Sequence, residues 1–83
     1  MHVTIKLYAT LGDYLPTGTK NNRVEAEVAD QSTVTAALAP FALPPKLTHL
    51  VLVNGVFIPP NERATTRLQP GDTLAVWPPI AGG

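Results

Sequence analysis

The stretch HVTIKLY, residues 2–8, decides how the rest of the chain is interpreted, because its apolar and polar residues alternate. Val3, Ile5 and Leu7 fall on one face of an extended chain, and the other four side chains fall on the opposite face. Alternation with a period of two, carried by β-branched residues, is typical of a strand with one buried face. We therefore predict a strand over residues 2–8 that covers a core on one side.

A second alternating segment, RVEAEVA at residues 23–29, follows after a turn-rich connection. Its apolar residues again share one face, so we predict that it pairs with the first strand as an antiparallel hairpin. The connection is longer than the tight hairpin loops and is expected to hold a short helical turn near residues 10–14, before Pro16 and Gly18 break it.

The second half of the chain carries similar strand signals. LVLVN, residues 50–54, is a continuous apolar run, which we interpret as a strand buried on both faces. An Asn-Gly pair then predicts a hairpin turn into VFI, residues 56–58, which two prolines end. The last predicted strand is TLAVW, residues 73–77, after a Pro-Gly-Asp turn.

Residues 30–43, DQSTVTAALAPFAL, contain the main predicted helix. Ser32 is expected to cap its start, and apolar residues follow at helical spacing. Pro40 disfavours helical geometry at Ala39, so the helix is expected to be short. A helix between two hairpins covers one face of a mixed sheet whose first and last strands are parallel at its centre. The predicted fold class is therefore α+β, a β-grasp (ubiquitin-like) mixed sheet with one main helix packed on one face.

Composition and charge exclude several classes of function. The 83 residues suffice for one domain, and six Lys and Arg residues balance six Asp and Glu residues, so no basic field favours nucleic acid. The chain has no cysteine for a disulfide, a thiolate nucleophile or a zinc ligand. The first residues lack the apolar core of a signal peptide, and no apolar run approaches the roughly 18 residues of a membrane span. We expect a cytoplasmic protein without a nucleic-acid or membrane partner.

The side chains do not suggest a catalytic or metal site. His2 and His49 are the only histidines, and neither has the spacing to a serine and a carboxylate that nucleophilic catalysis requires. Glu25 and Glu27 share the outer face of a strand, which is more typical of solubility than of an acid/base pair. The sequence contains no His/Asp/Glu cluster with ligand spacing. We expect no metal, no bound cofactor and no enzyme activity of the chain alone.

The ending WPPIAGG, residues 77–83, has a different character. Neither proline has an N–H for a strand ladder, so the last strand must end at Trp77, and their fixed φ favours an extended exit. The residues after Ile80 have almost no side chain, so this peptide could enter a narrow channel of another protein. Its ionised carboxylate is a poor electrophile that a partner would have to activate, most simply with ATP. We predict a domain at residues 1–77 and a protruding reactive tail at residues 78–83; the alternative is a frayed end without a role.

Two aromatic residues adjoin this tail. Tyr8 ends the first strand and Trp77 ends the last, each on the outward face, so parallel pairing would bring both rings to one sheet face beside the tail. Phe57 or Ile58 is expected to extend this surface. An aromatic patch on a small domain often marks a protein contact, although the rings could simply cover a sheet face that has no helix.

Four segments together resemble the MoaD/ThiS family of sulfur-carrier proteins, in order and spacing and over essentially the whole chain. They are KLYATLGDYLP, LVLVNGVFIPPNE, LQPGDTLAVWPP and IAGG. The PP-x-x-GG ending beside an aromatic residue is most similar to the small subunit of molybdopterin synthase. The chain departs from the family pattern at Gly12-Asp13, because many relatives carry an arginine near position 12.

The resemblance implies a sulfur carrier in molybdopterin (molybdenum cofactor) biosynthesis. An E1-like enzyme would adenylate Gly83 with ATP, and a sulfur donor would convert the acyl-adenylate to a thiocarboxylate. The implied acceptor is the large subunit of molybdopterin synthase or another sulfur acceptor enzyme. The residues implied for the chemistry are Gly83 and Gly82, and those implied for partner binding are Tyr8, Phe57, Trp77, Pro78, Pro79, Ile80 and Ala81.

Other functions remain open at this point. The same tail chemistry could supply sulfur for thiamine, cysteine or tRNA thiolation. The chain could be a ubiquitin-like modifier whose terminal glycine is joined to lysine amines of targets. It could also be an interaction domain with an inert tail.

Overall fold

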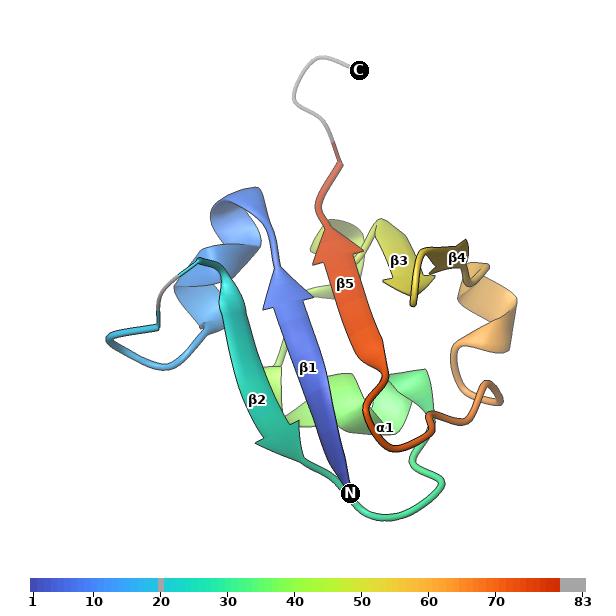
Figure 1. Ribbon diagram of the computed structural model, residues 1–83. Helices are drawn as coiled ribbons and strands as arrows, with labels where there is room; N and C mark the ends of the chain where they lie inside the picture. The colour runs from blue at the N-terminus through green and yellow to red at the C-terminus, as the bar shows by residue number, and fades with distance from the viewer. Residues whose placement is uncertain (20, 80–83) are drawn as a thin grey trace.

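The computed structural model describes residues 1–19 and 21–79. Figure 1 shows one mixed sheet of five strands with the helix α1 behind it. The strands lie side by side in the order β2-β1-β5-β3-β4. Their bounds are β1 (His2–Leu7), β2 (Arg23–Glu27), β3 (Leu50–Val53), β4 (Val56–Phe57) and β5 (Thr73–Trp77).

The pairing of the strands follows the predicted topology. β1 pairs antiparallel with β2 and parallel with β5, and β3 pairs antiparallel with both β5 and β4. The first and last strands are therefore parallel neighbours inside the sheet, as the sequence predicts. The connection between β1 and β2 contains the predicted helical turn as a 3-10 helix, η1 (Ala9–Tyr14), whose Leu11 is fully buried.

The core lies between the sheet and α1 (Val34–Leu38). Alternate residues of the central strands point into it, so the period-two pattern of the sequence becomes a buried face. Burying these side chains, at about 1.5–3 kcal/mol each, is the main stabilising contribution in so small a domain. The buried core residues are Val3, Ile5, Leu7, Leu11, Val34, Ala37, Leu38, Val51, Ile58, Leu68, Leu74 and Val76.

The start of α1 corrects the predicted cap. Thr33, and not Ser32, is the N-cap, because its extended backbone brings Oγ1 to accept a 3.1 Å hydrogen bond from the Ala36 N–H. The Ser32 hydroxyl is already engaged, since it donates to the Ala29 carbonyl at 2.7 Å in the preceding turn. The cap therefore lies one residue later than the sequence pattern indicates.

The end of α1 corrects a second detail. Ala39 keeps helical angles (φ −53°, ψ −42°), although the sequence predicts that Pro40 disfavours them there. The helix tightens into a 3-10 turn, η2 (Ala39–Phe41), and Pro40 stands at the start of this turn, where a missing N–H costs little. The α-helix is nevertheless short, as predicted, with five residues.

Two 3-10 turns were not predicted from the sequence, η3 (Pro45–Leu47) and η4 (Pro60–Glu62). Each has a proline in its first turn, a position for which the fixed φ of proline is suited. Together with β4 they form the side of the molecule next to β3 (Figure 1).

The predicted burial of β3 on both faces is also wrong. Val51 is fully buried, but Leu50 and Leu52 are only half-buried, because they point to the face of the sheet that α1 does not cover. Ile58, offered as one extension of the outer aromatic surface, lies instead in the core with 8% of its surface exposed. Its N–H donates to the Val51 carbonyl at 2.9 Å, which fixes it at the end of the hairpin.

Candidate functional site

Two aromatic rings stack where β1 and β5 end. The parallel register sets Leu7 beside Val76, so the next residues, Tyr8 and Trp77, lie at the same end of the sheet. Their ring centroids are 4.4 Å apart and their planes differ by 6°. The Tyr8 N–H donates to the Val76 carbonyl at 3.0 Å and holds the two strand ends together. The structure thus brings together the two rings that the sequence places side by side, while their role in partner binding stays a prediction.

Further apolar side chains continue this surface across β3 and β4. Leu50 is opposite Trp77 in the β3–β5 pair, and Leu52 is opposite both Ala75 and Phe57. Cross-strand partners point to the same side of a sheet, so all of them lie on the side opposite α1. Phe57 is 51% exposed, although most phenylalanines in proteins are buried. We call this surface the apolar face; its residues are Tyr8, Leu50, Leu52, Phe57, Ala75 and Trp77.

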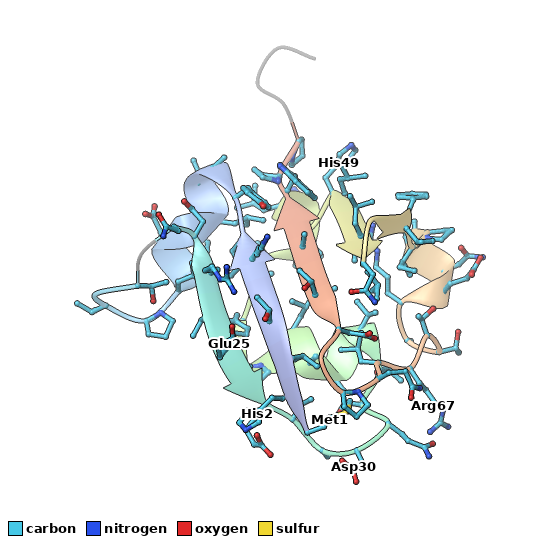
Figure 2. The ribbon with its side chains drawn as sticks, in the orientation of Figure 1. Met1, His2, Glu25, Asp30, His49 and Arg67 are labelled. Atoms are coloured by element: carbon cyan, nitrogen blue, oxygen red, sulfur yellow. The ribbon has the colours of Figure 1, made fainter. Side chains whose placement is uncertain are left out.

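The other half of the same sheet side is polar. On β1 and β2, Thr4 Oγ1 donates to Glu25 at 2.8 Å, and the Arg23 guanidinium donates to Glu25 at 3.3 Å. The hydrogen bond from Thr4, followed by that from Arg23, lowers the pKa of the Glu25 carboxyl below its ordinary value. Figure 2 shows Glu25 and His2 on the β2 side, toward the end of the sheet opposite the tail. The apolar face is therefore confined to the part of the sheet from which the tail leaves.

The backbone at the end of β5 positions the tail. The Trp77 carbonyl accepts a 3.1 Å hydrogen bond from the His49 N–H, and Figure 2 shows His49 beside this end of β5. Pro78 is half-buried and Pro79 is exposed, and the strand ends at Trp77 as predicted. The remaining predicted tail residues, Ile80, Ala81, Gly82 and Gly83, lie outside the described residues.

Arg63 is a residue of this region that the sequence reasoning missed. Its Nε donates to the Ile58 carbonyl at 3.2 Å, and its two terminal nitrogens donate to the carbonyls of Thr48 and His49, both at 2.9 Å. Burial lowers the pKa of the Arg63 guanidinium. Arg63 lies in a polar connection without periodicity, so no spacing in the sequence marks it.

Residues 1–19 and 21–79 were compared with two further kinds of feature, a metal centre and a membrane-spanning helix. In that part of the chain, no group of three or more His, Cys, Asp or Glu side chains is placed to hold a metal ion. None of its helices is long and apolar enough to cross a membrane. A mostly apolar pocket of about 550 Å³ lies between α1 and the turns η3 and η4, away from the apolar face.

Comparison with protein families matches the ThiS family over residues 5–83. The chain belongs to the ThiS family. The resemblance to MoaD/ThiS sulfur carriers that the sequence segments carry is thereby confirmed. A comparison with curated proteins gives no match.

Solved structures agree with this assignment. SAMP1 from Haloferax volcanii is 25% identical, with 100% of both chains covered and a TM-score of 0.70. The thiamine biosynthesis protein ThiS from Geobacter metallireducens is 17% identical, again with 100% of both chains covered, and has a TM-score of 0.66. A chain in the complex of subunits 1 and 2 of the molybdopterin-converting factor from Helicobacter pylori is 17% identical over 100% of both chains, with a TM-score of 0.62. The last two likenesses concern the fold alone, and the β-grasp prediction is confirmed.

Proposed function

We propose that this ThiS-family protein carries sulfur as a thiocarboxylate on Gly83 and donates it in molybdopterin biosynthesis. The observation that carries the proposal is the stacked Tyr8–Trp77 pair, which places an apolar face at the point where the chain leaves β5 toward Gly83. A partner that binds this face has the tail within its reach. Family membership supports the proposed chemistry, and the geometry of the apolar face supports its proposed use as a docking surface.

The chemistry requires only the carboxylate of Gly83 from this chain. A carboxylate oxygen attacks the α-phosphorus of ATP and pyrophosphate leaves, which gives an acyl-adenylate. A sulfur nucleophile then attacks the acyl carbon and AMP leaves, which gives the thiocarboxylate. ATP and the sulfur donor belong to an E1-like adenylating enzyme, and the chain itself binds no cofactor in this scheme. Because glycine has only a hydrogen in place of a side chain, Gly82 and Gly83 would not hinder attack on the acyl carbon.

Partner binding is assigned to the apolar face and to the tail. Half-exposed aromatic residues with few competing charges are typical of the central residues of a protein interface. We propose that the E1-like enzyme and the large subunit of molybdopterin synthase bind Tyr8, Phe57 and Trp77 in turn. Pro78 and Pro79 would then direct Ile80, Ala81 and the two glycines into the partner's active site.

Two features support molybdopterin as the destination. The sequence Trp77-Pro78-Pro79, followed after two residues by the glycine pair, resembles the ending of molybdopterin synthase small subunits. The fold is also similar to that of a chain in the subunit complex of the Helicobacter pylori molybdopterin-converting factor. A carrier for thiamine, cysteine or tRNA thiolation would use the same first step and differ only in the acceptor.

Reconstitution with purified components tests the destination. The protein is incubated with ATP, sulfide and an adenylating enzyme from the same cells, and the thiocarboxylated product is then given to a molybdopterin synthase large subunit and its precursor. Formation of the dithiolene product, lost when Gly82 and Gly83 are deleted, supports the proposal. Thiocarboxylation without dithiolene formation by any large subunit of those cells would redirect it to another sulfur acceptor.

A second candidate is protein modification, which one observation favours. The identity to SAMP1, a small archaeal modifier protein, is 25%, against 17% for the molybdopterin-converting factor chain. A modifier would use the same adenylation, but a lysine amine would then displace AMP and form an amide. Purification of a tagged chain from its native cells under denaturing conditions separates the functions, because only a modifier leaves covalent conjugates that require Gly83.

A further inference from the structure

The last carbonyl of β5 depends on a contact that comes from outside the sheet. The Trp77 carbonyl accepts the His49 N–H at 3.1 Å, and the carbonyl of the same His49 accepts a terminal N–H of Arg63 at 2.9 Å. Residue 49 therefore connects the Arg63 side chain to the backbone atom that directly precedes the tail. The two prolines that follow have no N–H, so they cannot add a backbone donor to this connection.

Arg63 also fixes the two segments that carry this connection. Its other terminal nitrogen holds the Thr48 carbonyl at 2.9 Å, just before β3 begins, and Nε holds the Ile58 carbonyl at 3.2 Å, just after β4 ends. One planar guanidinium thus ties together three carbonyls from both ends of the β3–β4 hairpin. Only an arginine has donors in such a fork, since a lysine ammonium is a point charge on a flexible stem.

The surroundings of the Arg63 side chain indicate that it holds backbone groups in position and does not form an ion pair. Within the described residues no carboxylate oxygen lies within 4.0 Å of Arg63, and all three of its hydrogen-bond partners are neutral carbonyls. The side chain lines the pocket beside Thr48 and Pro60, which is separate from the apolar face. Arg63 would therefore not contact a partner bound to the apolar face. It would affect that partner only by changing the positions of His49 and Trp77.

We infer that Arg63 is a positioning residue that sets the direction in which the tail leaves β5. The inference rests on the proposed function, because a set direction matters only if a partner's active site must receive Gly83. The end of β5 has β3 on one side and β1 on the other. On the β1 side it is held independently of Arg63, since the Tyr8 N–H donates to the Val76 carbonyl. Loss of Arg63 should therefore loosen the end of β5 on its β3 side and leave the aromatic stack and the apolar face in place.

The test uses Arg63→Lys and Arg63→Ala in the full chain, with Arg67→Ala as the matched control. Arg67 is an exposed arginine whose side chain contacts Gln31, and Figure 2 shows it far from the tail. Amide hydrogen exchange is followed by NMR at His49, at Tyr8 on the β1 side of the end of β5, and at Leu7, whose N–H donates to the carbonyl of Asn22, the residue directly before β2. Thiocarboxylation with ATP, sulfide and the adenylating enzyme gives kcat and KM.

We expect His49 exchange to accelerate on the order of tenfold in Arg63→Ala and less in Arg63→Lys, with Tyr8 and Leu7 unchanged. We expect kcat to fall by about tenfold or more while KM stays near the wild-type value, because the tail is misdirected after docking has occurred. Arg67→Ala should match the wild type in every readout. Arg63→Lys keeps the charge and the stem, so it remains informative even where Arg63→Ala unfolds.

Three results would overturn the inference. His49 exchange could stay unchanged, or it could rise together with Leu7, which would indicate only general destabilisation. The variants could also retain the kcat of Arg67→Ala, in which case the contact would not act on the tail. Absence of thiocarboxylation in the wild type would contradict the proposed function instead, and the exchange data alone would then decide whether Arg63 holds the exit.

Discussion

Replacing Trp77 with alanine tests the aromatic stack on which the site is built. The change removes a partly buried indole and its contact with the Tyr8 ring at a centroid distance of 4.4 Å. Truncation of a buried aromatic costs about 3–5 kcal/mol, and a half-buried one about half of that, of which the stacking itself contributes roughly 0.5–1.5 kcal/mol. We therefore expect a loss of about 2 kcal/mol in the free energy of unfolding.

That loss is large for this domain but should not unfold it. A chain of 83 residues has a free energy of unfolding of roughly 4–12 kcal/mol. A loss of about 2 kcal/mol lowers the melting temperature by about 8–16 °C in a domain of this size. The variant should thus remain folded at 25 °C, where its partner binding can be measured.

The assay is a double-mutant cycle of Tyr8→Ala and Trp77→Ala, with urea unfolding followed by circular dichroism. The stack predicts a coupling free energy of about 1 kcal/mol between the two positions. Tyr8→Ala combined with Phe57→Ala is the control, because Phe57 lies on the same face but on the edge strand β4. A Tyr8–Trp77 coupling no larger than that of the control pair would refute the reasoning.

The remaining predictions concern the helix cap, the core and one titrating group. Thr33→Ala removes the acceptor for the Ala36 N–H and should lower the free energy of unfolding by about 1 kcal/mol in urea unfolding, whereas Ser32→Ala should cost less. Leu74→Ala, at a fully buried position of β5, should cost about 2–5 kcal/mol in the same assay. Thr4→Val should raise the pKa of the Glu25 carboxyl toward its ordinary value in a carbon NMR titration, because the main cause of its lowering is removed. Folding lowers that pKa, so the Glu25 carboxylate stabilises the folded state at pH values above its ordinary pKa. This stabilisation is lost as the pH falls through the pKa of the folded state. Acid should therefore destabilise Thr4→Val less than it destabilises the wild type.

The predictions that succeeded rest on periodic patterns. The alternation of Val3, Ile5 and Leu7 sets one face of β1 toward the core, and a helix between two hairpins leaves few topologies for the sheet. The positions of Tyr8 and Trp77 follow from strand ends and parallel pairing, so the stack was accessible from the sequence.

The predictions that failed concern features without a period. A continuous apolar run does not indicate whether one or both faces of a strand are covered. The run therefore predicts burial of Leu52, although α1 covers only the other side of the sheet. Ser32 and Thr33 are both good caps, and only the local backbone decides between them. Arg63 depends on three carbonyls distant in sequence, a geometry that no local pattern contains.

The most direct test of sulfur transfer is the intact mass of the protein from its native cells, measured before and after alkylation. We expect a species in which one oxygen is replaced by one sulfur, located at Gly83 and reactive toward the alkylating agent. The same species should form from the purified protein with ATP, sulfide and its adenylating enzyme. A protein that remains in the carboxylate form under both conditions would contradict the assignment of sulfur transfer to Gly83.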